Sequence, residues 1–198
     1  MQASPEAVRN GFLIAVFVTF IVFFGVRVLA RQPLLNFLKD LKFWPSLSLM
    51  QFFSWTIVIL FVFTWIYFVR LLSGVTDPPP GIPANILALM GISTGATVAS
   101  AGVSRRYPRE VSGKGQPWRT VFCEGESPSL GRLQMFAWTV IAILIYVYIV
   151  SSTLSGSRAL ASVELLGLPD IDPSLLVLMG FSQAGYVGSK AIATTPPQ

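Results

Sequence analysis

The sequence predicts an all-α integral membrane protein with five transmembrane helices, arranged as one N-terminal helix followed by two parallel two-helix repeats. Three observations lead to this class. Hydrophobic residues make up 53% of the 198-residue chain and charged residues only 12%, whereas soluble domains carry about 25% charged residues. Five apolar runs have nearly the length of a helix that crosses a bilayer. A two-helix sequence pattern occurs twice.

The apolar runs define the expected order of segments along the chain. The first run is long for a cleaved signal peptide, and we expect it to be retained as a span. The predicted spans cover residues 11–30, 50–72, 84–103, 133–153 and 173–191. They divide the chain into an N-terminal transmembrane helix (1–31), a cytoplasmic interfacial amphipathic helix (32–46), a first repeat (47–103), a basic cytoplasmic loop (104–130), a second repeat (131–192) and a C-terminal tail (193–198).

The basic residues predict the orientation of the chain. Of the 14 Lys and Arg residues, only Arg9, Arg70 and Arg158 fall on one side of the predicted spans, and the rest fall on the other. Lys and Arg collect on the cytoplasmic side of membrane proteins. We therefore expect the N-terminus outside and the C-terminus in the cytoplasm.

The loop between the third and fourth spans carries a basic cluster of Arg105, Arg106 and Arg109. The bias of positive charge toward the cytoplasm predicts such a cluster by itself. The alternative is a site for an anionic lipid, a nucleotide or an acidic partner.

The repeat has two matching parts. PSLSLMQFFSWT begins at Pro45 and PSLGRLQMFAWT at Pro128, an offset of 83 residues. LALMGISTG begins at Leu87 and LVLMGFSQA at Leu176, an offset of 89 residues. The difference falls in the outer loop, where insertions cost little. Because each copy starts on the cytoplasmic side, we expect parallel repeats related by a pseudo-twofold axis along the membrane normal.

The second helix of each repeat carries two distinct faces. Small residues spaced by four allow close helix packing in lipid, and we expect this face to lie at helix contacts; it comprises Gly91, Gly95, Ala99, Gly180, Ala184 and Gly188. A hydroxyl stripe lies on another side of these helices, and it comprises Ser93, Thr97, Ser100, Ser182, Tyr186 and Ser189.

Two glutamines are the most polar side chains of the first helices of the repeats. Gln51 and Gln134 each precede a Trp by four residues, so Gln51 shares a face with Trp55 and Gln134 with Trp138. An unpaired amide in hydrocarbon costs several kcal/mol. The favoured interpretation is therefore an intramembrane latch between each Gln and the hydroxyls of the second helix. The alternative is that these groups line a conduction path or bind a ligand.

The composition argues against an enzyme. The chain has no His and a single Cys, Cys123, so the commonest general base is missing and no zinc cluster is expected. No Asp or Glu lies inside a predicted span, although ion-coupled transport ordinarily requires an intramembrane carboxylate. We therefore expect no catalytic residues, no metal and no cofactor, and no nucleic acid as a partner.

The second copy also carries a family resemblance. SLGRLQMFAW followed by LPDIDPSLLVLMGFSQAGYVGSK resembles a family of bacterial multi-pass membrane proteins with the pattern SLxxxQMxxW, then LPx(I/F) and LxL(M/L)GISxxxYxxxK. The first copy matches more loosely, with Thr97 where the pattern has Tyr and Ala101 where it has Lys. The resemblance implies the duplicated two-helix module and a location in the bacterial inner membrane.

Two functional classes remain open. The first is a homo-oligomeric, weakly selective ion channel or pore, in which the small-residue helices lie near the path and neutral hydroxyls partly replace the hydration shell of an ion. The second is a non-conducting membrane anchor or scaffold for a partner protein. The lipid bilayer and further copies of the chain are the expected partners in both cases.

Overall fold

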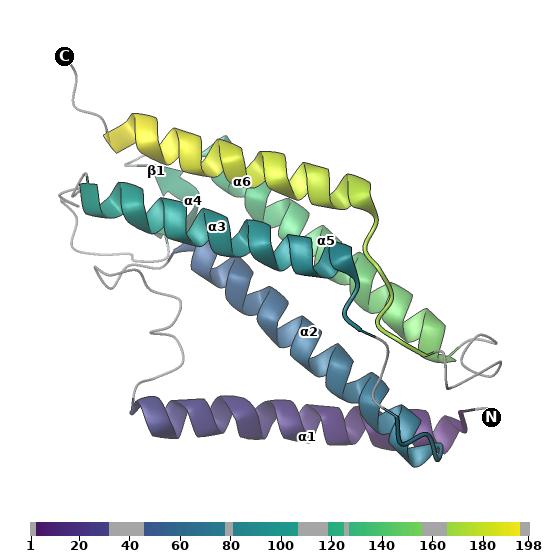
Figure 1. Ribbon diagram of the computed structural model, residues 1–198. Helices are drawn as coiled ribbons and strands as arrows, with labels where there is room; N and C mark the ends of the chain where they lie inside the picture. The colour runs from purple at the N-terminus through teal and green to yellow at the C-terminus, as the bar shows by residue number, and fades with distance from the viewer. Residues whose placement is uncertain are drawn as a thin grey trace. The chain divides into compact units, whose positions relative to one another are not determined.

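The computed structural model describes residues 3–31, 46–77, 81–106, 119–124, 127–155 and 166–194. Five long helices account for most of these residues, and the all-α prediction is confirmed. The elements are α1 (Pro5–Ala30), α2 (Leu47–Leu72), α3 (Ala84–Arg106), α4 (Arg119–Phe122), β1 (Cys123–Glu124), β2 (Ser127–Pro128), α5 (Leu130–Ser155) and α6 (Pro173–Thr194) (Figure 1).

Four helical segments are long and apolar enough to cross a membrane, so the chain is a helical membrane protein. In the described residues they are Pro5–Ala30, Leu47–Leu72, Ala84–Val103 and Leu130–Leu154. The fifth predicted span, α6, is not among them.

The first helix begins six residues before its predicted start because Ser4 caps it. The Ser4 hydroxyl accepts a hydrogen bond from the Ala7 amide at 3.1 Å, and Pro5 occupies the first turn, where its missing amide proton is not needed. The helix ends at Arg31, whose φ of 51° is left-handed and stops the helical hydrogen bonding.

The chain forms two compact units. Unit 1 comprises Met1–Gln32, Trp55–Leu87 and Ile143–Ile171, and unit 2 comprises Pro33–Ser54, Ala88–Ala142 and Asp172–Gln198. Helices α2, α3 and α5 contribute to both units. The predicted interfacial helix at 32–46 lies outside the described residues except for Ser46, and the tail at 193–198 lies outside them except for 193–194.

Unit 1 is built on a close contact between the start of α1 and the end of α2. A small face of Ala7, Gly11 and Ala15 is buried on α1. A Cβ atom added at Gly11 would lie 2.8 Å from Val69 Cγ2 and 3.1 Å from the Val69 amide nitrogen, so only glycine permits this approach. The Trp65 indole donates to the Val8 carbonyl at 3.0 Å.

Aromatic rings continue the packing of unit 1. Phe12 meets Phe61 and Trp65 edge-on, with ring centroids 5.5 and 5.1 Å apart. Trp55 of α2 meets Tyr146 of α5 at 6.1 Å, and both side chains are fully buried. The later turns of α1 expose their large apolar side chains, including Phe17, Phe20 and Leu29, as expected for a surface that faces lipid.

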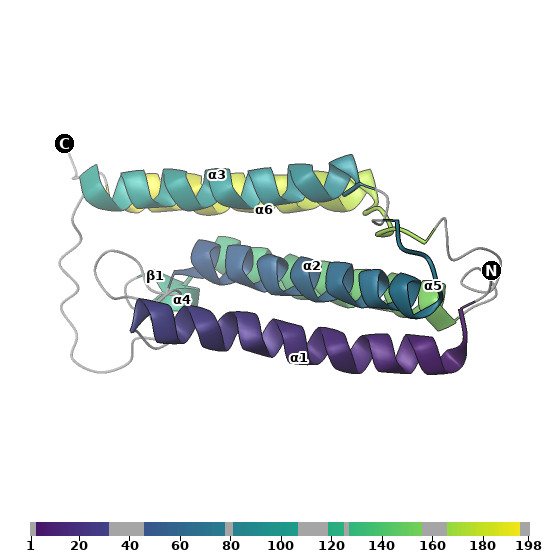
Figure 2. The same ribbon diagram turned by 60° about the horizontal axis from the view of Figure 1, so that its bottom comes forward.

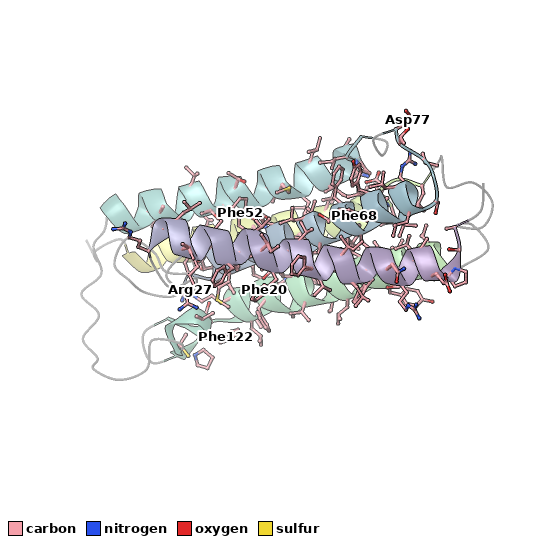
Figure 3. The ribbon with its side chains drawn as sticks, turned by 90° about the horizontal axis from the view of Figure 1, so that it is seen from below. Phe20, Arg27, Phe52, Phe68, Asp77 and Phe122 are labelled. Carbon is pink, nitrogen blue, oxygen red and sulfur yellow. The ribbon has the colours of Figure 1, made fainter. Side chains whose placement is uncertain are left out.

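In unit 2, α3 and α6 run side by side in the same direction (Figure 2). The later part of α6 meets α4 and the starts of α2 and α5 in a small apolar cluster of Leu47, Val121, Met135 and Tyr186. A short hairpin, β1–β2, precedes α5 within the segment predicted as a basic loop. Phe122 of α4, which is labelled in Figure 3, packs edge-on against Phe136 of α5, with ring centroids 5.2 Å apart.

We expect Gly11→Leu to destabilise the fold by about 1–3 kcal/mol, because the added side chain overpacks against the α2 backbone. Gly25→Leu is the matched control on the same helix, since a Cβ atom there meets nothing within 4 Å. Unfolding in detergent, followed by tryptophan fluorescence and circular dichroism, measures both variants. Equal stability of the two variants would show that α1 does not pack on α2 through Gly11.

Candidate functional site: a buried polar seam

The start of α2 buries polar side chains on one face. Ser46, Ser48 and Gln51 are all buried, and Ser48 and Gln51 are neighbours on the helix because they are three residues apart. The Ser46 and Ser48 hydroxyls are 3.1 Å apart and hydrogen-bonded. This part of α2 therefore presents hydroxyl and amide groups inside unit 2.

Helix α3 meets this face with its hydroxyl stripe. The hydroxyls of Ser48 and Ser100 are hydrogen-bonded at 3.0 Å. The Thr97 hydroxyl lies 3.3 Å from the Ser48 carbonyl and 2.9 Å from the Ser93 carbonyl, and it donates to them. The sequence prediction that hydroxyls gather on this side of α3 thus corresponds to direct contacts with α2.

Helix α6 adds an amide to the same set of groups. The Gln183 side-chain nitrogen donates to the Ser93 hydroxyl at 3.4 Å, and both residues are buried. We call this set the polar seam. It comprises the hydrogen-bonded residues Ser48, Ser93, Thr97, Ser100 and Gln183, together with Gln51, which is buried on the same face of α2 as Ser48.

The hydroxyl groups of the predicted stripe on α6 make different contacts from those on α3. The Ser182 hydroxyl donates to the Leu178 carbonyl at 2.9 Å, and the Ser189 hydroxyl donates to the Tyr186 carbonyl at 3.0 Å, both within the helix. Tyr186 is buried in the apolar cluster, where the guanidinium carbon of Arg132 lies 5.7 Å from its ring centroid. The two stripes are therefore not equivalent.

The predicted glutamine latch needs correction. The structure pairs Ser100 with Ser48, and the side-chain oxygen of Gln51 is buried without a hydrogen-bond partner among the described residues. Gln134, its counterpart in the second copy, is exposed, and Trp138 is half-buried. The buried side chains in this part of α5 are Met135 and Thr139, each one residue after Gln134 and Trp138. The buried side of α5 is therefore rotated by about 100° relative to the predicted side.

Trp55 also does not take part in the predicted latch. Its side chain is fully buried against Tyr146, and its indole nitrogen has no hydrogen-bond partner among the described residues. Trp55 therefore contributes packing to unit 1 rather than a hydrogen bond to a second-helix hydroxyl.

The glycines of the predicted small-residue face make no close contact with other described residues. Gly91, Gly95, Ala99, Ala184 and Gly188 are exposed and Gly180 is half-buried. A Cβ atom added at Gly91, Gly95 or Gly188 meets nothing within 4 Å, and one at Gly180 meets only the Ile92 side chain at 4.0 Å. We call these six positions the open face. The expectation of tight helix contacts is wrong within one copy.

The basic cluster is not part of the described site. Arg109 and the side chains of Arg105 and Arg106 lie outside the described residues. The seam itself offers only neutral hydroxyls, amides and carbonyls, which exchange hydrogen bonds and do not act as strong bases. Within the described residues, no three His, Cys, Asp or Glu side chains gather in a way that would hold a metal.

A second polar cluster in unit 1 was not predicted from the sequence. Arg70 is buried at the end of α2 and donates to the Leu166 carbonyl at 3.1 Å and to the Asp77 carbonyl at 3.5 Å. The Asn85 side-chain nitrogen donates to an Asp170 carboxylate oxygen at 2.9 Å. These bonds tie the segment before α6 to the ends of α2 and α3. Contacts between loops and helix ends have no regular spacing in the sequence, so the periodicity of the sequence does not predict them.

Asp172 caps the start of α6. Its carboxylate accepts a hydrogen bond from the Ser174 amide at 2.7 Å, as favoured N-cap residues do. The Ser174 hydroxyl and amide lower the pKa of this exposed carboxyl, because their hydrogen bonds favour the charged form.

We expect Ser48→Ala to lower the free energy of unfolding by roughly 1 kcal/mol, because it leaves the Ser100 hydroxyl without this partner. Ser152→Ala is the control, since that exposed hydroxyl bonds only within its own helix. A double-mutant cycle with Ser100→Ala isolates the pairwise contribution. No coupling between positions 48 and 100 would contradict the seam.

We expect Asp172 to titrate below the ordinary value of 3.8. Because the folded pKa is lowered, the stabilisation from this cap is present above the unfolded pKa and is lost as the pH falls through the folded pKa. Asp172→Asn keeps a capping oxygen and should abolish this pH dependence. The Ser174 amide shift followed by NMR against pH measures the midpoint. A midpoint at or above the ordinary value would refute the cap.

Comparisons with known proteins add no further constraint. No protein-family model, no curated protein and no solved structure matches the chain. The resemblance to a bacterial membrane-protein family therefore stays a prediction. What the protein does has to be inferred from the polar seam and the open face.

Proposed function

We propose that the protein is a non-conducting membrane scaffold that assembles with further copies of itself through the open face. One observation carries this proposal: the hydroxyls of the α3 stripe are hydrogen-bonded inside the chain, with Ser93 and Ser100 buried, whereas five of the six open-face residues are exposed. The polar groups are therefore used to hold the helices together, and the small residues are left for an outside contact.

The polar seam supports a closed bundle. Ser93 is 1% exposed and Ser100 is 3% exposed, so within one copy these hydroxyls do not line a water-filled path. A pore-lining stripe has to present its hydroxyls to water or to an ion. The seam instead provides the hydrogen bonds that hold helices together in the absence of a hydrophobic driving force between them.

The open face supports self-association. Glycines at spacing four weaken a helix by about 1 kcal/mol each relative to Ala, a cost that packing against lipid alone does not offset. Close backbone approach between helices does offset it, and small-xxx-small faces are the usual means. The exposed side chains of Val98, Val177 and Phe181 lie on the same two helices and supply apolar contact area.

We further propose that α6 is a fifth span and that the chain is a duplicated module. With 22 residues, α6 is ~33 Å long, enough for a hydrocarbon core of about 30 Å. Its buried side holds Ser182 and Gln183, while Val177 and Phe181 are exposed.

The parallel course of α3 and α6 supports two parallel repeats (Figure 2). The distribution of Lys and Arg favours an outside N-terminus and a cytoplasmic C-terminus in a bacterial inner membrane.

A weakly selective channel is the second candidate. It is supported by Thr94, an exposed hydroxyl residue between Gly91 and Gly95, which bonds to the Met90 carbonyl. In a ring of copies, the open face would then surround a path lined by backbone and small side chains. The scaffold is favoured because the α3 hydroxyls of the predicted stripe, those of Ser93, Thr97 and Ser100, point into the chain, and Thr94 was not part of that stripe.

Cysteine cross-linking tests the scaffold in a Cys123→Ser background. We expect Gly95→Cys to form a disulfide-linked dimer in native membranes, because this position lies on the open face. Ala96→Cys, the next residue on the same helix, is buried and should stay monomeric. The purified oligomer should give no current in planar bilayers.

Gly95→Leu separates assembly from folding. A side chain at this position has open space within the chain, so helical content should be unchanged while the oligomer dissociates. A Gly95→Leu variant that extracts as the normal oligomer would show that the open face meets lipid. A reproducible current from the wild-type oligomer would instead favour the channel.

A further inference from the structure

Two amide oxygens inside unit 2 have no hydrogen-bond partner among the described residues. They are the side-chain oxygens of Gln51 and Gln183, whose side chains are 3% and 2% exposed. Buried polar atoms are satisfied in nearly all native structures, and an unsatisfied one calls for a specific explanation. Two such acceptors in one small unit therefore indicate an occupant.

The packing of α2 on α3 brings Gln51 toward the middle of the polar seam. Ser48 contacts Ser100 and Thr97, and α2 runs in the opposite direction to α3 (Figure 1). One turn further along α2 is Gln51, and one turn further back along α3 from Thr97 is Ser93. Gln51 is therefore expected beside the Ser93–Thr97 turn of α3.

Gln183 reaches the same turn from α6. Its side-chain nitrogen lies 3.4 Å from the Ser93 hydroxyl oxygen, which is a long hydrogen bond. The amide is thereby held at Ser93 while its oxygen is left without a donor. Gln183 and Ser93 thus meet at one turn of α3, and the packing of α2 on α3 is expected to bring the Gln51 oxygen to the same turn.

The chemistry of these groups defines the occupant. Amide oxygens accept hydrogen bonds, so the occupant has to donate them. A metal cation would also suit oxygen ligands, but the seam has no carboxylate, and burying an ion without an opposite charge is costly. Buried water typically makes about three hydrogen bonds to groups that are otherwise unsatisfied.

We propose that unit 2 contains an internal water site bounded by Gln51, Ser93 and Gln183. The water donates to the two amide oxygens and accepts from the Ser93 hydroxyl, which joins α2, α3 and α6 through one molecule. This site does not depend on the scaffold proposal, because it lies inside one copy and involves no residue of the open face.

Leucine substitutions test the site through stability. If the two oxygens were dry and unpaired, Gln51→Leu or Gln183→Leu would remove a penalty and raise the unfolding midpoint. With a bridging water, each substitution leaves the remaining partners unsatisfied, and we expect the midpoint in detergent to fall by about 2–4 °C. Gln134→Leu is the matched control, since it is the exposed repeat counterpart of Gln51, and it should leave the midpoint unchanged.

Water contact is measured directly by water-edited solid-state NMR on bilayer samples with ¹⁵N-labelled glutamine side chains. We expect rapid magnetisation transfer from water to the Gln51 and Gln183 amides, and its loss at Gln183 in the Gln51→Leu variant. No transfer to either amide, or a raised midpoint in both leucine variants, would overturn the proposal. A midpoint that rises with sodium or potassium chloride but not with choline chloride would also overturn it, in favour of a cation.

Discussion

The cost of an unpaired polar group in hydrocarbon is the constraint on which the rest of the structure depends. Helices that cross a membrane satisfy their own backbone, so only polar side chains have to find partners elsewhere. In unit 2 the start of α2 and the polar side of α3 satisfy each other through Ser48, Thr97 and Ser100. These hydrogen bonds fix which side of α3 faces inward, and the small residues are consequently left on the outside.

The sequence was sufficient to predict the helices and part of the seam. Long apolar runs identified the four helices of the described residues that are long and apolar enough to cross a membrane, and the spacing of Ser93, Thr97 and Ser100 placed these residues on one face. Helical periodicity determines which residues share a face, but it does not determine which partner they meet. Ser100 pairs with Ser48 instead of Gln51, a difference of one turn that only the packing of α2 on α3 decides.

The repeat shows more clearly that sequence periodicity does not determine which partners a residue contacts. Gln51 and Gln134 occupy matching positions in the sequence, yet one is buried and the other exposed. The buried side of α5 is displaced by one residue relative to α2, and α1 packs on α2 through Gly11 and Trp65. Matching sequence positions therefore have different surroundings in the two copies of the repeat. The contacts of Arg70 and Asn85 escaped prediction because they join loops to helix ends, where no periodicity applies.

The contact of α1 with α2 has a consequence for how the protein adapts to its bilayer. Ala7, Gly11 and Ala15 are the buried residues of α1, so the helix is held over its first three turns, whereas its later turns expose large apolar side chains such as Phe17, Phe20 and Leu29. Transmembrane helices respond to a bilayer that is too thin or too thick by tilting. We therefore expect the later turns of α1 to adjust to hydrophobic mismatch by tilting.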